Sequence, residues 1–239
     1  MRILITNDDG IRSPVLPHLA RWAMKHGEVT VVAPKTEQSG KSQAIDFRSA
    51  VEVLPVELEP GVRAYSMEST PADCVRFAVE GLKESYDLLI SGINIGYNLG
   101  DDMAYSGTLG AILEGSRCGI RGMAVSADPD HIMEAPAYLD SLFEWMGKER
   151  LFETGNLYNI NIPPRVEGIR ITKQGGMFYT DTFVSCGENL YKQVGAPHQR
   201  EFTDLRVDID AVMNHWISVT PITACRTDFS VFEKLVKQS

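Results

Sequence analysis

The chain opens with a short run of branched apolar residues that leads directly into two acids and a glycine. Residues 2–6 read RILIT and residues 7–10 read NDDG. A buried strand of a parallel sheet has this near-continuous apolar character, and open α/β folds place ligands at the carboxyl ends of such strands. Two neighbouring carboxylates repel each other unless a positive charge lies between them. The opening therefore predicts a parallel sheet with a divalent cation at Asp8 and Asp9.

Strand and helix signals alternate over the first two-thirds of the chain. Apolar runs predict strands, and capping residues followed by apolar stripes predict helices. Strands are expected at residues 2–6, 29–33, 87–91, 123–127 and 159–162, with a less regular hairpin over 51–66. Helices are expected from Ser13-Pro14 to Lys25, from Thr70-Pro71 to Leu82, from Gly107 to Arg117 and over 133–149, with a glycine-rich loop over 92–102. This alternation predicts βαβ units with right-handed crossovers, and hence an α/β fold with a mainly parallel sheet.

The pattern changes after Pro164. Residues 169–194 carry aromatic residues and glycines in the manner of a hairpin, residues 216–220 predict a last strand and residues 228–237 a last helix. We therefore expect a catalytic core over 1–164 and a carboxyl-terminal extension over 165–239, which is an arm rather than a second domain.

Composition narrows the classes of partner. The net charge of −9 argues against a broad phosphate-neutralising surface, so no nucleic-acid partner is expected. No apolar stretch approaches the roughly 20 residues that span a membrane, and the opening strand does not look like a signal peptide. The four widely spaced cysteines predict reduced, mostly buried thiols. A cytoplasmic protein is the expectation.

Polar groups from four distant segments are expected at one edge of the sheet, because loops that follow parallel strands open on the same side. These segments are Asp8-Asp9, Ser39-Gly40, residues 91–98 and residues 106–108. Their carboxylate, hydroxyl and amide oxygens suit Mg²⁺ or Mn²⁺ better than zinc. The helix expected at Gly107 offers free N–H groups to a phosphate. A cation beside a phosphate suggests hydrolysis of a phosphate ester.

Each segment also has a plain structural interpretation. The two acids with Gly10 form an ordinary turn sequence, Ser39-Gly40 is a common loop dipeptide, and Ser106 is a good helix cap. It is their convergence on one edge that favours a site. One tempting motif fails: residues 40–42 (GKS) imitate the end of a P-loop, but Lys35 stands where that motif requires glycine.

At these residues the chain closely resembles the SurE (survival protein E) family of metal-dependent nucleotide phosphatases. The resemblance covers nearly the whole chain, with the motifs in the same order. The matching segments are residues 5–11 (ITNDDGI), 32–34 (VAP) leading to Ser39-Gly40, 70–75 (TPADCV), 91–102 (SGINIGYNLGDD), 105–108 (YSGT), 159–163 (NINIP) and 217–221 (ISVTP).

The resemblance implies a Rossmann-like, three-layer αβα core and removal of phosphate from nucleoside 5′- and 3′-monophosphates, with polyphosphate as a further substrate. It implies one divalent cation per subunit, Mg²⁺ or Mn²⁺, and a homodimer or homotetramer formed by exchange of carboxyl-terminal arms. By position, the metal ligands fall on Asp8, Asp9, Ser39 and Asn94, the first two also being the catalytic residues. The phosphate- and substrate-binding residues fall on Asn98, Ser106, Gly107, Thr108 and Ser42.

The chain departs from the family pattern beside Ser39. Gln43 and Ala44 stand where the family often has asparagine and serine, and this affects the expected turnover. One alternative is therefore a nucleotide-binding sensor that hydrolyses slowly or not at all. A dinucleotide-dependent oxidoreductase is a second alternative, which rests on fold analogy alone because the glycine fingerprint is missing.

Overall fold

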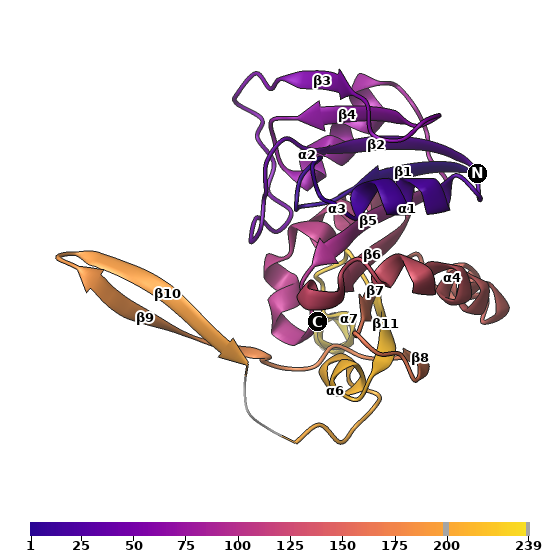
Figure 1. The fold of residues 1–239 in the computed structure, drawn as a ribbon. Coiled ribbons are helices and arrows are strands. Elements are labelled where there is room, and N and C mark those ends of the chain that lie inside the picture. Colours follow the sequence, from indigo (N-terminus) through magenta and orange to yellow (C-terminus); the bar gives the residue numbers. More distant parts are fainter. Residues whose placement is uncertain (198–200, 238–239) are drawn as a thin grey trace.

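A computed structural model describes residues 1–197 and 201–237 of the chain (Figure 1). The strands of its main sheet are β1 (Arg2–Thr6), β2 (Glu28–Pro34), β3 (Val53–Val56), β4 (Arg63–Met67), β5 (Leu88–Ile95), β6 (Arg121–Ala127), β7 (Leu157–Ile162), β8 (Gly168–Ile171) and β11 (Trp216–Ile222). A separate hairpin consists of β9 (Tyr179–Gly187) and β10 (Leu190–Pro197). The α-helices are α1 (Leu16–Ala23), α2 (Pro71–Arg76), α3 (Gly107–Arg117), α4 (Leu139–Lys148), α5 (Leu151–Thr154), α6 (Asp208–Met213) and α7 (Phe229–Val236).

The main sheet has nine strands in the order β3-β4-β2-β1-β5-β6-β7-β11-β8. The six from β4 to β7 run parallel, and β3 and β11 pair antiparallel to their neighbours β4 and β7. Helices cover both faces, which gives the three-layer α/β architecture that the sequence predicts. The α/β class and its mainly parallel sheet are thus confirmed.

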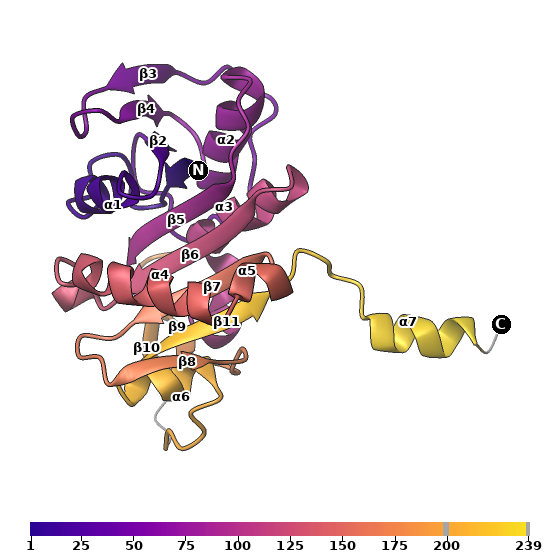
Figure 2. The same cartoon turned by 90° about the vertical axis from the view of Figure 1, so that its right-hand side faces the viewer.

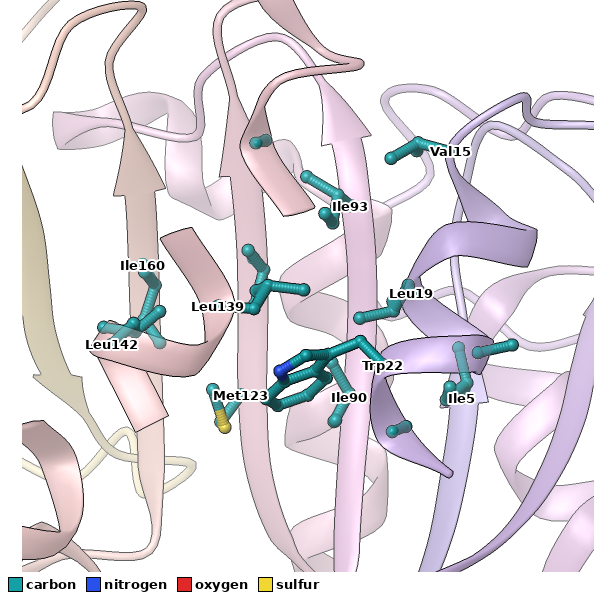
Figure 3. Close-up of a cluster of buried hydrophobic side chains, with 14 of the residues drawn as sticks. Ile5, Val15, Leu19, Trp22, Ile90, Ile93, Met123, Leu139, Leu142 and Ile160 are labelled. Atoms are coloured by element: carbon teal, nitrogen blue, oxygen red, sulfur yellow. The ribbon is translucent and has the colours of Figure 1, made fainter. Parts of the chain in front are cut away.

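Alternate residues of the central strands face opposite layers. Ile3 and Ile5 of β1 pack with α1 and α4 on one face, whereas Leu4 packs with α2 and α3 on the other. Figure 3 shows the first of these clusters, with Trp22 of α1 lying between the strands and the helices. Because both faces are buried, the strands are apolar almost without interruption, and this is the signal by which the sequence reveals them.

The chain reverses direction across the sheet between β1 and β5. From β1 it moves outward through α1 to β2, and later returns through α2 to place β5 on the other side of β1. At such a reversal the loops that follow the two neighbouring strands diverge to opposite faces and leave a crevice at their carboxyl ends. The loop after β1 carries Asp8 and Asp9, and the end of β5 carries Asn94.

Several element boundaries differ from expectation. Ser13 and Pro14 form a turn and not a cap, and α1 begins at Leu16 with Pro17 in its first turn. β5 continues to Ile95, so the predicted loop begins four residues late. A 3₁₀ turn at Ala135–Tyr138 precedes α4, because Pro136 stands inside the predicted helix. The cysteine prediction was partly wrong: all four are free thiols, but only Cys74 is buried.

The segment after residue 164 contributes to the main sheet and also extends away from it. β8 and β11 complete the sheet, and α6, which the sequence did not predict, packs on β11. In contrast, the β9–β10 hairpin and α7 project from the body (Figures 1 and 2). The division at residue 164 stays a prediction. None of the described helices is long and apolar enough to cross a bilayer.

Candidate metal and phosphate site

Asp8 is a buried carboxylate fixed by the first turn of α3. The Thr108 hydroxyl donates to Asp8 Oδ1 at 2.6 Å, and the Thr108 N–H donates to Asp8 Oδ2 at 3.2 Å. Gly107 makes this approach possible, since a Cβ there would lie 3.1 Å from the Asp8 side chain. Burial raises the pKa of Asp8, and the hydrogen bonds from Thr108 only partly oppose it. Thr108 thus holds the Asp8 carboxylate in one orientation, although the two residues are 100 positions apart in the sequence.

Asp9 lies beside Asp8 and is tied to the neighbouring strand. Its Oδ2 accepts from the Ile95 N–H of β5 at 3.1 Å. Burial first, and then the charge of Asp8, raise the pKa of Asp9 to about 6. Glu37 adds a further negative charge that raises the pKa of both aspartates. The charged groups that raise these two pKa values are the carboxylates of Asp8 and Glu37. A divalent cation would relieve the repulsion among them.

Ser39 lies on the loop that follows β2, and that loop is attached to the backbone of Asp8. The Gln38 N–H donates to the Asp8 carbonyl at 2.7 Å, so the residue that precedes Ser39 is bonded directly to Asp8. The Ser39 hydroxyl donates to Glu37 Oε1 at 2.6 Å. Its oxygen therefore keeps lone pairs for another partner. Glu37 was not among the predicted site residues, because a lone glutamate in a polar loop carries no signal.

Asn94 lies at the end of β5, where the pairing with β6 shifts register between Ser91 and Asn94. Such irregularities are common beside functional sites because they redirect a side chain. The glycine there is required by space, since a Cβ on Gly92 would meet the Val125 carbonyl oxygen at 2.2 Å. Asn94 Nδ2 donates to the Gly96 carbonyl at 2.7 Å, which leaves Oδ1 as its acceptor.

The residues expected to bind phosphate are mostly held by other parts of the chain. Ser106 caps α3 by accepting from the Leu109 N–H, and Thr108 is bonded to Asp8. The hydroxyl of Ser42, whose φ is +53°, donates to the Ala104 carbonyl. Asn98 is buried and its amide donates to Ser126. Of the first three N–H groups of α3, those of Thr108 and Leu109 thus already have side-chain acceptors.

The oxygen donors at this edge suit a hard cation. Two carboxylates, one hydroxyl and one amide oxygen are the ligand types that Mg²⁺ and Mn²⁺ prefer. Within residues 1–197 and 201–237, no group of three or more histidine, cysteine, aspartate or glutamate side chains is placed to hold a metal. The set predicted from the sequence has only two such residues, Asp8 and Asp9, and takes its other two ligands from Ser39 and Asn94, so a group of this composition falls outside that description.

Gln43, a departure from the family pattern, has a structural partner. Its Nε2 donates to Glu114 Oε2 at 2.8 Å, and Arg76 binds the other oxygen of this buried glutamate at 3.2 Å. The side chain thus joins the loop after β2 to α3. This contact gives Gln43 a role in positioning the loop that carries Ser39.

The fold and this edge define a three-layer α/β protein with an acidic, oxygen-rich sheet edge at the point where the chain reverses across a parallel sheet. The family described as "Survival protein SurE" matches residues 3–181, and the chain belongs to this family. Among curated proteins it is similar to the "5'-nucleotidase SurE" of Caldanaerobacter subterraneus subsp. tengcongensis, with 38% identity over 98% of this chain and 95% of that protein. The protein of the same name from Thermosipho melanesiensis is 36% identical over 98% of this chain and 96% of its own length.

A solved structure supports the same relationship. The SurE protein from Aquifex aeolicus aligns with a TM-score of 0.82 and 28% identity, over 100% of this chain and 99% of that one. The correspondence therefore includes the carboxyl-terminal extension as well as the core. It confirms the family that the sequence motifs indicated.

Proposed function

We propose that the protein is a divalent-metal-dependent phosphomonoesterase that converts nucleoside 5′-monophosphates, and also 3′-monophosphates, to nucleoside and phosphate. The relatives named 5'-nucleotidase SurE align over nearly their whole lengths, which supports this activity. The observation that carries the proposal is the pair formed by the buried Asp8 and the partly buried Asp9, which lies after β1 and is bonded to the end of β5. One Mg²⁺ or Mn²⁺ per subunit would be held by Asp8, Asp9, Ser39 and Asn94.

The chain's own residues prepare the site for this chemistry. When bound, the cation supplies Lewis-acid polarisation of a phosphoryl oxygen and lowers the pKa of a water that attacks phosphorus. Thr108 orients Asp8 through both of its hydrogen bonds, and Ile95 orients Asp9. The Gly107 N–H, at the positive end of α3, would bind a phosphate oxygen. Ser106 supports this end of the helix as its cap, while Ser42 and Asn98 support the surrounding loops.

Hydrolysis is expected to depend on Mn²⁺ or Mg²⁺. The panel is AMP, GMP, 3′-AMP, p-nitrophenyl phosphate and short polyphosphate, each assayed for released phosphate with either metal or with EDTA. A cation contributes several kcal/mol to phosphoryl transfer, so EDTA should lower the rate at least about a hundredfold. Polyphosphate is expected to be a side substrate.

The same panel separates the enzyme from the sensor. Readdition of Mn²⁺ after EDTA restores the rate if loss of the cation was the cause. Saturable binding of AMP with no phosphate released from any substrate would favour the sensor. Full activity in EDTA would contradict a metal-dependent mechanism.

We infer that the projecting hairpin and α7 mediate a homodimer or homotetramer. α7 exposes Phe229, Val231 and Phe232, and the hairpin exposes Phe183 and Tyr191. An eight-residue helix with little packing of its own is marginal in water, so an apolar surface from another subunit would stabilise it. Both elements extend from the body in the views of Figures 1 and 2.

The double substitution Phe229→Ser with Phe232→Ser is expected to dissociate this assembly. Removing two aromatic side chains from a small interface removes much of its apolar area, and aromatic residues dominate such contacts. Sedimentation velocity would show a shift to a smaller species in the double variant. Glu233→Ala, on the same helix, serves as the control and should sediment like the wild type. An unchanged distribution in the double variant would exclude α7 from the interface.

A further inference from the structure

A large apolar cavity opens beside the candidate metal site. Its volume is about 630 Å³, which lies in the range of small-molecule sites. Gly96 lines the cavity and also accepts from Asn94, while the preceding Ile95 donates to Asp9. The cavity wall therefore begins at Gly96, the residue after the one that binds Asp9. Two residues of extended chain, from the Ile95 N–H to the far end of Gly96, span at most about 7 Å. A ligand whose phosphate meets the cation could extend its other end into this space.

One side of the cavity is aromatic. Phe178 and Tyr179 line it as a contiguous pair, with ring centroids 4.7 Å apart in an edge-to-face arrangement. Phe202, Met213 and three prolines enlarge this apolar wall. Flat aromatic rings stack on such surfaces, whereas a phosphate or a sugar gains little there. The wall therefore selects a planar, weakly polar ligand group.

Two hydrogen-bond acceptors lie side by side on the polar part of the lining. Tyr97 donates its hydroxyl proton to Asp128 Oδ2 at 3.0 Å, and Asp128 Oδ1 accepts from His131 and from the Asp130 N–H. A carboxylate has about four acceptor positions, so Oδ2 keeps one, and the Tyr97 oxygen keeps its lone pairs. The ligand edge that fits here must carry two adjacent donors.

Asp128 is anionic at neutral pH. Partial burial acts to raise the pKa of Asp128, but the hydrogen bonds from His131, Tyr97 and the Asp130 N–H outweigh it and leave the pKa below its ordinary value. Burial, followed by the charge of Asp128, raises the pKa of Tyr97, so its phenol keeps the proton that it donates. The pair therefore accepts and does not donate towards the cavity.

We propose that this cavity is a nucleobase site that selects guanine. The 2-amino group and the N1–H of guanine are adjacent donors that match Asp128 Oδ2 and the Tyr97 oxygen, respectively, and the ring would stack on the Phe178–Tyr179 wall. Adenine presents one donor beside an acceptor, and hypoxanthine lacks the 2-amino group. The inference rests on the proposed nucleotidase function and names GMP as the substrate that it favours.

The test compares GMP with IMP, which differs from GMP only by the missing amino group. We expect the wild type to favour GMP about tenfold or more in kcat/KM, because a hydrogen bond to a charged group is lost with IMP. Asp128→Asn should bring this ratio close to one. Asp130→Asn removes the same charge two residues further along, at a position that does not line the cavity, and it should keep the wild-type ratio.

The stacking wall is tested separately. Tyr179→Ala should lower kcat/KM for GMP and IMP together, about five- to a hundredfold relative to phenyl phosphate, which has no base to stack. Tyr179→Phe keeps the ring and should keep the relative rates. Equal use of GMP and IMP by the wild type, or a GMP preference that survives Asp128→Asn, would overturn the guanine site.

Failure of the proposed function gives a different result. If none of the phosphate esters is hydrolysed with either metal, the nucleotidase assignment fails. The base site is then tested by calorimetry, which compares the binding of GMP and IMP to the wild type and to Asp128→Asn. Tighter binding of GMP that Asp128→Asn abolishes would support the site without turnover. Equal binding of the two nucleotides would reject it.

Discussion

An Asp8→Asn protein is expected to hydrolyse nucleoside monophosphates at least about a thousandfold more slowly than the wild type, with its fold intact. The substitution removes one of two charges that would hold the cation, and the loss of several kcal/mol of transition-state stabilisation corresponds to this factor. The fold should survive because asparagine can keep both contacts with Thr108. Its carbonyl oxygen can accept from the Thr108 N–H, and its NH₂ can donate to the hydroxyl, which rotates to accept.

Stability in the absence of metal distinguishes this explanation from misfolding. Burial raises the pKa of Asp8, so the ionised carboxylate opposes folding at neutral pH and a neutral amide does not. In EDTA the variant should therefore melt at or above the wild-type Tm. The wild type should gain about 5–10 °C from Mn²⁺ at a hundredfold excess over its Kd, and the variant should not.

The control for this experiment is Asp101→Asn. Asp101 is an exposed acid on the loop after β5 and has no contact with Asp8 or Asp9 among its described hydrogen bonds. It should keep both its activity and the Tm shift caused by Mn²⁺. Near-normal phosphatase activity in Asp8→Asn would remove the two aspartates from the mechanism.

Local sequence predicted the elements that are buried on both sides. Strands such as β1 and β6 are continuous apolar runs because helices cover both faces, and Ser106 marks the start of α3 because its hydroxyl caps the helix. Boundaries that depend on packing were less predictable. β5 runs on to Ile95 through an irregular pairing with β6, and the sequence of a glycine-rich segment resembles a loop.

The sequence placed the acids at the correct edge but not the partners that hold them. Asp8 and Asp9 follow a strand signal, so their position was predictable from parallel-sheet geometry. That Thr108 binds Asp8 was not predictable, because the contact joins residues 100 positions apart. Asp128, which the proposed base site uses, was not predicted for the same reason: a single acid after β6 becomes informative only when Tyr97 and an apolar cavity lie beside it.

A Gly110→Ala protein is expected to lose about a hundredfold in activity although alanine is the better helix former. Gly110 lies in α3, where the loop after β2 crosses the helix. A Cβ at this position would lie 2.1 Å from the Ser42 carbonyl oxygen and 2.9 Å from the Gln43 Cα, and these backbone atoms cannot rotate away as a side chain can. The loop must therefore move, and with it Ser39. A displacement of about 1 Å in a catalytic arrangement costs on the order of a hundredfold in rate.

The stability of the same variant shows whether the loop or the helix yields. Alanine favours the helix by about 1 kcal/mol, whereas overpacking costs about 1–3 kcal/mol, so a net loss in the free energy of unfolding is expected in chemical denaturation. Gly147→Ala is the matched control, because it lies in α4 and its added Cβ would meet no atom within 4 Å beyond its chain neighbours and the backbone of its own helix. It should keep full activity and raise the Tm by about 2–4 °C. If Gly110→Ala behaved like Gly147→Ala in both assays, the close approach of the loop to α3 would have no part in forming the site.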